Sequence, residues 1–327
     1  RSFTRIRAGD LLEFVNQEYD KGRYWPEPLV QLNPNYQRKD TVETLVREGL
    51  LHPTCGDIFR VPGVHGGGTS LRLYRHQQEA ISCIRQGKSC VVTTGTGSGK
   101  SLAFFIPMFH RILEAKERDS TPRTRAIIIY PMNALANSQM EEVQKFLGNL
   151  PEENRPIRVK RYTGQESASE REDIAKNPPD VLLTNYMMLE YILTRFEATD
   201  RQVVEHCKGL EMLVLDELHT YRGRQGADVA MLIRRVRQRF GAGNLICVGT
   251  SATMTSVGSA IDKSAAVAEV SSKLFGTSIP VENVIQETLE RATNPSLGIS
   301  AVKAKLRDAV LLKEMVWASD GSFQNDP

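Results

Sequence analysis

The sequence has no apolar run long enough to cross a membrane. Its longest ones, at 126–129 and 212–215, fall far short of the about 20 residues that a bilayer-spanning helix needs. Residues 1–10 mix charged and polar side chains and lack the apolar segment of a secretory signal. We therefore expect no membrane partner.

Cysteine is also scarce, with five residues in a chain of 327. No two cysteines form a Cys-x-x-Cys pair, and none stands near a histidine at the spacing of a zinc site. Scattered single cysteines are typical of a reducing compartment, so we expect free thiols and a cytoplasmic protein. The five residues are Cys55, Cys83, Cys90, Cys207 and Cys247.

An excess of charge of one sign is missing as well. The chain has 42 basic and 39 acidic residues, a formal net charge of +3. This balance does not predict a nucleic-acid partner from bulk electrostatics, so any anionic partner must meet a local basic patch. With 40% hydrophobic and 25% charged residues, the composition is that of a globular protein and excludes wholesale disorder.

The residue pattern divides the chain into three parts. Residues 1–70 predict a small, mainly helical accessory module, and four glycines within 63–70 predict a flexible boundary after it. Residues 71–258 alternate short apolar strands with helices, which is typical of βαβ crossovers in a doubly wound parallel sheet flanked by helices. Residues 259–327 predict a helical extension.

Within the central part the expected strands and helices alternate almost regularly. The strands are 89–93, 125–130, 157–162, 180–184, 212–216 and 244–249, and the helices are 75–86, 100–115, 134–147, 167–176, 188–196 and 227–240. An α/β domain of this kind places its ligand at the carboxyl edge of the sheet.

A glycine-rich segment follows the first of these strands and opens the next helix, as a phosphate-binding loop does. Glycines let backbone amides turn toward phosphate, and the helix N-terminus adds its positive end. Lys100 would neutralise the β and γ phosphates, and Ser101 would give a hydroxyl ligand to Mg²⁺. The segment departs from the strict motif because Thr94 stands in place of the first glycine. Its residues are Thr94, Gly95, Thr96, Gly97, Ser98, Gly99, Lys100 and Ser101.

Two adjacent carboxylates follow the buried strand 212–215, at the same predicted edge. We expect Asp216 to hold Mg²⁺ and Glu217 to orient and deprotonate an attacking water. Alone, an acidic strand end is more often a solvated edge of a sheet. Its combination with a phosphate loop favours a site for ATP hydrolysis.

The order and spacing of several motifs resemble the first RecA-like domain of the superfamily 2 DEAD/DEAH-box helicases. Beside the two segments above, these are Tyr74-Arg75-His76-Gln77, residues 130–135, 162–164 and 183–189, and Thr250-Ser251-Ala252-Thr253. Residues 216–223, Asp-Glu-Leu-His-Thr-Tyr-Arg-Gly, are particularly similar to the YprA-like branch, DNA helicases of repair and, in some members, of anti-phage defence. The resemblance covers about residues 72–254.

The resemblance implies roles for further residues of the nucleotide site. Gln77 would read the adenine edge, and His219 would complete the catalytic set and couple nucleotide state to motion. Ser251 and Thr253 would link the nucleotide site to strand binding. Leu218 stands where the family usually has alanine, a change that we expect to alter packing more than chemistry.

Two polar loops are assigned by the same resemblance to the groove that tracks a nucleic-acid strand. Loops of this kind bind sugar and phosphate without reading sequence, although by themselves they are ordinary turns more often than binding sites. The expected contacts are Asn133, Asn137, Thr184 and Asn185, with Arg222 and Arg224 and the run Arg158, Lys160 and Arg161 neutralising phosphates.

The sequence thus predicts the first half of an ATP-dependent DNA helicase, with ATP and Mg²⁺ as cofactors. Such a motor closes two RecA-like domains around ATP, and the 74 residues after Thr253 (327 − 253) are too few for the second. We expect that second domain and DNA, single-stranded or a duplex with a single-stranded tail, as partners. Repair or defence proteins are further expected partners.

Two other functions stay open at this point. A double-strand DNA translocase or remodeller of a defence or restriction-type complex would use the same motifs without separating strands. A nucleotide-dependent binding module without turnover is the other, and the intact Lys100, Asp216 and Glu217 disfavour it.

Overall fold

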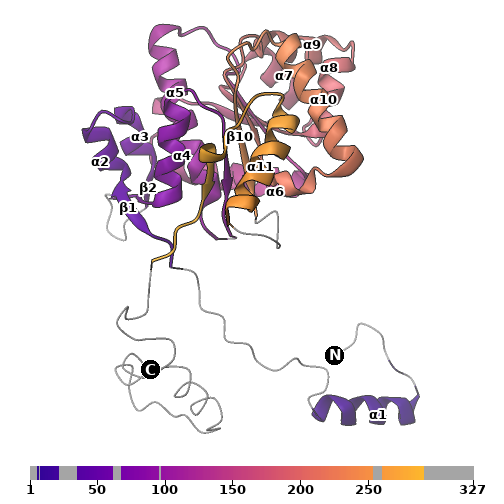
Figure 1. Ribbon diagram of the computed structural model, residues 1–327. Coiled ribbons are helices and arrows are strands. Elements are labelled where there is room, and N and C mark those ends of the chain that lie inside the picture. The colour runs from indigo at the N-terminus through magenta and orange to yellow at the C-terminus, as the bar shows by residue number, and fades with distance from the viewer. Residues whose placement is uncertain are drawn as a thin grey trace, which may run out of the picture. The chain divides into compact units, whose positions relative to one another are not determined.

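The structure is a computed structural model and describes residues 6, 8–21, 35–61, 68–95, 97–252 and 260–290 (Figure 1). The chain divides into two units, of which one ends at Asn35 and the other begins at Tyr36. Within the described ranges, no helix combines the length and the apolar character needed to span a bilayer.

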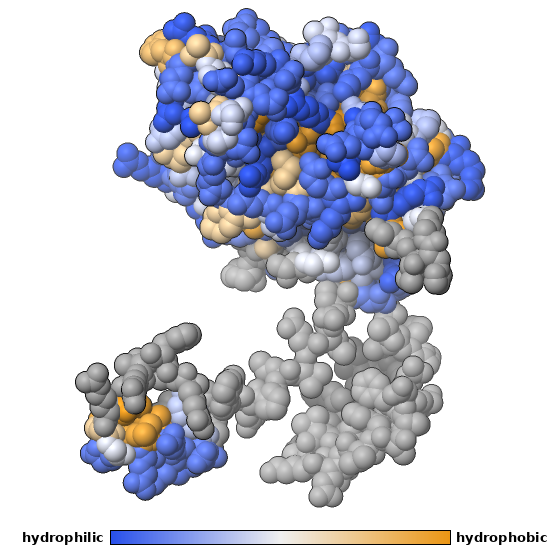
Figure 2. Space-filling model, turned by 180° about the vertical axis from the view of Figure 1, so that it is seen from behind, coloured by the Kyte–Doolittle hydropathy of each residue, from blue (hydrophilic) through white to orange (hydrophobic). Residues whose placement is uncertain are grey.

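In the first unit, the described residues include the amphipathic helix α1 (Gly9–Asp20). Its side chains Leu11, Leu12 and Phe14 are exposed, and Figure 2 shows hydrophobic surface gathered on one side of this helix and hydrophilic surface on the other.

A parallel sheet of seven strands forms the centre of the second unit (Figure 1). Every pair of neighbouring strands is parallel, which confirms the predicted α/β fold. Across the sheet the strands are β11 (Val284–Gln286), β5 (Cys90–Thr93), β10 (Ile246–Ser251), β9 (Met212–Leu215), β6 (Ala126–Tyr130), β8 (Val181–Asn185) and β7 (Val159–Tyr162).

Helices bury both faces of this sheet, as the alternation along β6 demonstrates. Ile128 and Tyr130 lie in one apolar core, and Ile127 and Ile129 lie in the other. The first core is covered by α2 (Val42–Arg47), α3 (Pro53–Ile58), α4 (Arg75–Arg85), α5 (Lys100–Arg118) and α6 (Asn133–Leu147), and the second by α7 (Ala168–Lys176), α8 (Tyr186–Thr194), α9 (Ala198–His206), α10 (Gly223–Arg239) and α11 (Ala260–Phe275). Of these, α9 is not among the helices predicted for the central part of the chain.

The segment 36–61 belongs to the same unit as the sheet, whereas the sequence pattern places it in a separate module ending near residue 70. Strand β1 (Arg38–Thr41) pairs with β4 (Arg72–Tyr74), and Leu45 and Phe59 are buried in the core that α5 covers. Shared apolar burial joins this segment to the sheet. Part of the glycine-rich stretch, 62–67, lies outside the described residues, and β3 (Thr69–Ser70) after it pairs with β2 (Arg60–Val61).

The predicted extension also contributes to the sheet domain, which therefore does not end at residue 258. Helix α11 packs into the second core, and β11 pairs in parallel with β5. Three residues are too few to display a strand period, so the sequence pattern does not reveal β11. The remainder of the predicted extension, 291–327, lies outside the described residues.

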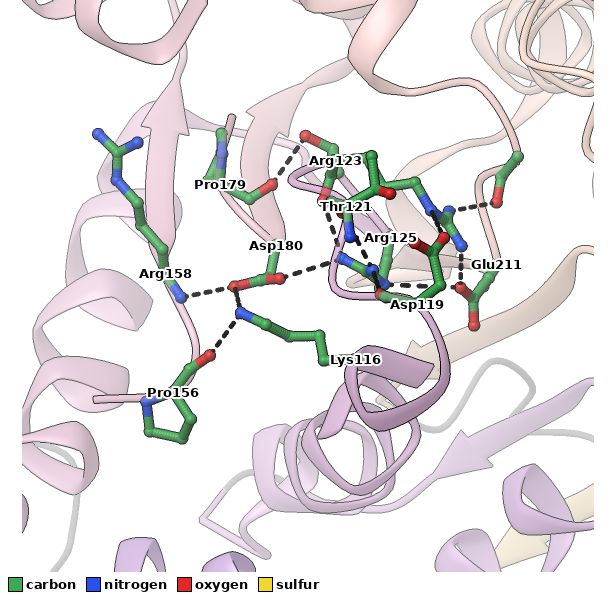
Figure 3. Close-up of polar contacts among 12 residues, drawn as sticks. Lys116, Asp119, Thr121, Arg123, Arg125, Pro156, Arg158, Pro179, Asp180 and Glu211 are labelled. Atoms are coloured by element: carbon green, nitrogen blue, oxygen red, sulfur yellow. Dashed lines mark hydrogen bonds and ion pairs between the residues drawn. The ribbon is translucent and has the colours of Figure 1, made fainter. Parts of the chain in front are cut away.

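A buried ion network lies at the amino ends of the strands (Figure 3). Arg125, only 1% exposed, directs one guanidinium nitrogen at Asp180, at 3.4 Å. Lys116 at the end of α5 approaches the same carboxylate at 3.0 Å, and the Arg158 amide donates to it at 2.9 Å. Burial lowers the pKa of Arg125, and the charges of Asp180 and Glu211 oppose that shift. One carboxylate thus joins α5 to the ends of β6, β7 and β8.

We expect Asp180→Asn to lower the free energy of unfolding by about 3 kcal/mol, because the buried Arg125 and the half-buried Lys116 then lose the carboxylate that they share. Thermal or urea unfolding of the chain measures the change. The matched control is Glu172→Gln, which breaks an exposed pair with Lys176 and should cost less than about 0.5 kcal/mol. Equal losses in the two variants would contradict a special role for the buried carboxylate.

Candidate functional site

The phosphate loop leaves β5 at the carboxyl edge of the sheet and depends on glycine. Gly97 and Gly99 have φ of +78° and +68°, a region that residues with a side chain rarely adopt. A Cβ atom on Gly99 would also come 2.6 Å from Nε2 of Gln77. Position 99, which precedes α5, therefore requires glycine on two grounds. Of the predicted loop residues, Thr96 lies outside the described residues.

The departure from the strict loop motif has a structural role. The Thr94 side chain is buried, and its hydroxyl shares a hydrogen bond of 2.6 Å with Ser98 Oγ. The Lys100 ammonium donates to the Thr94 carbonyl oxygen at 3.3 Å. Thr94 therefore ties the two ends of the loop together, which the glycine of the strict motif could not do with a side chain.

Two side chains of α4 bind carbonyl groups of the loop. Gln77 is 2% exposed, donates to the Gly99 carbonyl at 2.9 Å, and accepts from the Tyr74 amide at 2.8 Å. Its carboxamide holds the loop, and the expected contact with an adenine edge stays a prediction. His76, which the sequence reasoning missed, is fully buried and pairs with the Ser98 carbonyl at 2.9 Å. Burial lowers the pKa of His76, so the neutral ring donates to that carbonyl.

The strand β10 brings the acidic pair to the phosphate loop, because it lies between β5 and β9. Its Thr250 hydroxyl donates to the Asp216 carboxylate and accepts from the Glu217 amide at 3.1 Å. Burial raises the pKa of Asp216, while the Thr250 hydrogen bond opposes that rise. Neighbouring residues in the sequence indicate no role for Thr250, because only the pairing of the strands brings it to Asp216.

Glu217 is held in a strained backbone conformation beside the loop lysine. Its φ of +54° is the one positive value of a non-glycine residue in the described part of the chain, and such outliers cluster at functional sites. Its carboxylate lies 3.9 Å from the Lys100 ammonium and 3.3 Å from His219 Nδ1. Ser251 Oγ is 3.4 Å from the same His219 nitrogen. The structure therefore brings these four predicted residues together, while Thr253 lies outside the described residues.

Leu218, which stands in the acidic motif where the family usually has alanine, fills a packing position, as the sequence suggests. Leu218 is 2% exposed and packs on β10 at Gly249. A Cβ on Gly249 would come 2.3 Å from Leu218 Cδ1, a distance that real atoms do not adopt. Gly249 therefore makes room for the larger side chain.

Three of the expected nucleic-acid contacts, Asn133, Asn137 and Asn185, are held by hydrogen bonds in two separate groups. The Asn185 amide donates to Asn133 Oδ1 at 2.7 Å, and Asn185 Oδ1 accepts from the Met188 amide at the start of α8. Arg161, at β7, donates to Asn137 Oδ1. These bonds fix the side chains in place before any ligand binds.

Thr184 and the two arginines differ from these asparagines. Thr184 is fully buried, and its hydroxyl donates to the Tyr162 carbonyl at 2.6 Å, so it joins two strands instead of facing a ligand. Arg222 and Arg224 are exposed at the start of α10. The preceding Tyr221 contacts the Tyr186 ring, with centroids 6.3 Å apart, which places the arginine segment beside the junction of β8 and α8, where Asn185 lies.

The residues at this edge fit a nucleoside triphosphate with Mg²⁺. The left-handed glycines and the start of α5 present amides and a positive helix end, which suit phosphate. The Ser101 hydroxyl and the Asp216 carboxylate are oxygen donors of the kind that hold Mg²⁺ beside phosphate and water. Within the described residues, no group of three or more His, Cys, Asp or Glu side chains could hold a metal ion. All five cysteines are free.

Several known proteins are similar to this chain in sequence. The DEAD/DEAH box helicase family matches residues 74–260, more than half of the 327 residues. The ATP-dependent helicase HRQ1 of Saccharomyces cerevisiae is 33% identical over 175 residues, 54% of this chain and 15% of that protein. YprA of Bacillus subtilis, named an uncharacterized ATP-dependent helicase, is 32% identical over 184 residues, 56% of this chain and 23% of that protein.

A solved structure shows the same fold. The helicase MrfA bound to DNA superposes with a TM-score of 0.58 at 25% identity, over 83% of this chain and 34% of that one. This likeness confirms the RecA-like fold, and the similarity to YprA confirms the predicted branch. The chain spans less than a quarter of the two curated relatives and about a third of the solved chain.

We expect Gly249→Ala to destabilise the chain by about 1–3 kcal/mol, because the added methyl overlaps Leu218. Leu218→Ala alone should also destabilise it, by leaving a cavity. In the double variant the two changes should compensate, with an interaction free energy of at least about 1 kcal/mol in a double-mutant cycle of unfolding. Additive effects would show that the two residues are not in contact.

Proposed function

Because the chain belongs to the DEAD/DEAH box helicase family, we propose that it is the first ATPase half of an ATP-driven DNA helicase. One observation carries the proposal: the phosphate loop and the Asp216–Glu217 pair meet at one sheet edge, on either side of β10. A cytoplasmic location goes with this proposal, as does a role in DNA repair or anti-phage defence.

In this proposal each residue of the site has one task. Lys100 and the loop amides bind the β and γ phosphates, and Ser101 and Asp216 hold Mg²⁺. When bound, the ion neutralises charge that develops on the phosphate oxygens. Glu217 accepts the proton of the attacking water. His219 lies between Glu217 and Ser251, where it can pass a change at the nucleotide to β10.

The DNA contacts in the proposal come from three asparagines and from Arg222 and Arg224, which follow the acidic motif. Asn133, Asn137 and Asn185 are fixed by hydrogen bonds, so binding orders no further side chains there. Polar loops of this type position a backbone without reading bases. The structure of MrfA bound to DNA supports DNA as the partner.

A second RecA-like domain completes the motor in this proposal. It supplies an arginine finger, which in other phosphoryl-transfer enzymes is worth about 10³–10⁵ in rate. The chain alone should therefore bind ATP and hydrolyse it slowly.

The second candidate is a double-strand DNA translocase that moves without unwinding. The fixed, sequence-independent contacts at the sheet edge serve either activity. A fork substrate assay on the longer protein separates them, because a translocase displaces a bound block and separates no strands.

We expect Glu217→Gln to keep nucleotide binding and to abolish ATP hydrolysis in the longer protein, since the amide has the same size and cannot accept the proton. DNA-stimulated phosphate release and binding of a fluorescent ADP measure the two properties. Glu153→Gln, at an exposed position, is the control and should change neither. Normal hydrolysis by Glu217→Gln would assign the general base to another residue.

We expect the chain to bind single-stranded DNA weakly, with an affinity that falls with salt by a slope of about −0.7 per neutralised phosphate. Replacing Arg222 and Arg224 by Glu should reduce the steepness of the slope and weaken all sequences alike. Arg239→Glu is the control, because it lies at the other end of α10, about 22 Å away at 1.5 Å per residue. Titration at several salt concentrations, with thermal unfolding in parallel, tests this. Lost stability with an unchanged slope would assign the two arginines a structural role.

A further inference from the structure

A carboxylate of the chain itself contacts the phosphate loop. Glu287 follows β11, the strand that the sequence pattern does not reveal, and its Oε2 accepts a hydrogen bond from the Gly95 amide at 2.6 Å. The two residues are 192 positions apart. A charged acceptor makes this bond stronger than one between neutral groups. An acidic side chain therefore lies at a loop whose other features suit anions.

The segment that carries Glu287 is clamped on both sides. We call residues 287–289 the strap. On one side, the Thr93 hydroxyl donates to the Ile285 carbonyl at 3.3 Å, just before the strap. On the other, the Gln37 amide donates to the Thr288 carbonyl at 2.8 Å, and Tyr36 forms an antiparallel bridge with Leu289. The strap thus links the loop strand to the segment that starts the domain.

Glycine at position 95 permits this approach. A Cβ on Gly95 would come 3.2 Å from the Tyr36 hydroxyl, which is tight, and would be in contact with Glu287 Oε2 at 3.4 Å. Burial and the Glu287 charge both raise the pKa of Tyr36, so its hydroxyl stays protonated. The strap, Tyr36 and the loop therefore form one packed contact around a negative charge.

We propose that Glu287 competes with nucleotide phosphate for the phosphate loop and that phosphate binding releases the strap. This rests on the proposed function, in which the loop binds nucleotide. The phosphate chain and the carboxylate have charge of the same sign, so each weakens the binding of the other at neighbouring loop amides. By linkage, a docked strap lowers nucleotide affinity by the same factor by which nucleotide loosens the strap. The occupancy of the loop is thereby coupled to the path of the chain that leaves β11.

Two substitutions separate charge from packing. Glu287→Gln keeps a side-chain oxygen that can accept from Gly95 and removes the charge, while Glu287→Ala removes both. The control is Glu282→Gln. This residue is exposed in the short turn Val281–Asn283 that precedes β11, so the change removes a charge from the same region without contact to the loop. Lys100→Ala reports on the nucleotide site itself.

The experiment titrates the chain with a fluorescent ADP and Mg²⁺, with inorganic pyrophosphate as a competitor. Both Glu287 variants should bind ADP more tightly, by up to about tenfold at low salt, with a smaller gain at high salt because ions screen the repulsion. Glu282→Gln should bind ADP with the same affinity as the wild-type chain. Pyrophosphate should compete more strongly in the Glu287 variants.

Hydrogen exchange follows the strap directly. Adding ADP and Mg²⁺ to the unchanged chain should speed exchange of the Gln37 amide, which the strap protects. In Glu287→Ala this amide should already exchange fast without ADP.

Unchanged ADP affinity in both Glu287 variants, together with lost binding in Lys100→Ala, would overturn the competition and leave the proposed function standing. Weaker binding in Glu287→Ala with unchanged binding in Glu287→Gln would also overturn it, since Glu287 would then only support the loop. If the unchanged chain bound neither ADP nor pyrophosphate, the proposed function itself would fail.

Discussion

The parallel pairing of β10 with both β5 and β9 is the constraint on which the site depends. The phosphate loop follows β5 and the acidic pair follows β9, so neither reaches the other without the strand between them. The register places Ser251 beside Thr93 and Gly249 beside Leu215. A slip of one residue would turn Thr250 away from Asp216 and bring a side chain where Leu218 packs.

Hydrogen bonds inside the protein preorganise the phosphate loop. Gln77 and His76 bind its carbonyls from α4, and Thr94 closes it from end to end. Buried polar groups need partners, and here the partners are supplied before nucleotide binds. The strained backbone at Glu217 is held by the hydrogen bond that its backbone N–H donates to the Thr250 hydroxyl. The surrounding contacts therefore offset the cost of an unusual backbone at the carboxylate that we propose as the general base.

The two edges of the sheet have different chemistry for a physical reason. At the amino edge, Arg125 and Lys116 share the Asp180 carboxylate, with Arg125 and Asp180 buried, which suits a purely structural role. At the carboxyl edge, the loop amides and Lys100 meet carboxylates: Glu217 lies 3.9 Å from the Lys100 ammonium, and Glu287 accepts from the Gly95 amide. Parallel strands make this division possible, because all strand ends of one kind lie at one edge.

Local sequence was enough to determine the loop, the acidic pair and six of the seven strands, because glycine spacing, apolar runs and charge at a strand end are properties of neighbouring residues. It did not determine the extent of the domain, since Leu45 and Phe59 are buried by helices distant in the chain and β11 is too short to show a period. The partners of Gln77, Thr250 and Thr184 were decided by the tertiary structure. The same holds for Glu287 and Gly95, because a hydrogen bond across 192 positions exists only after the sheet has brought its strands into register.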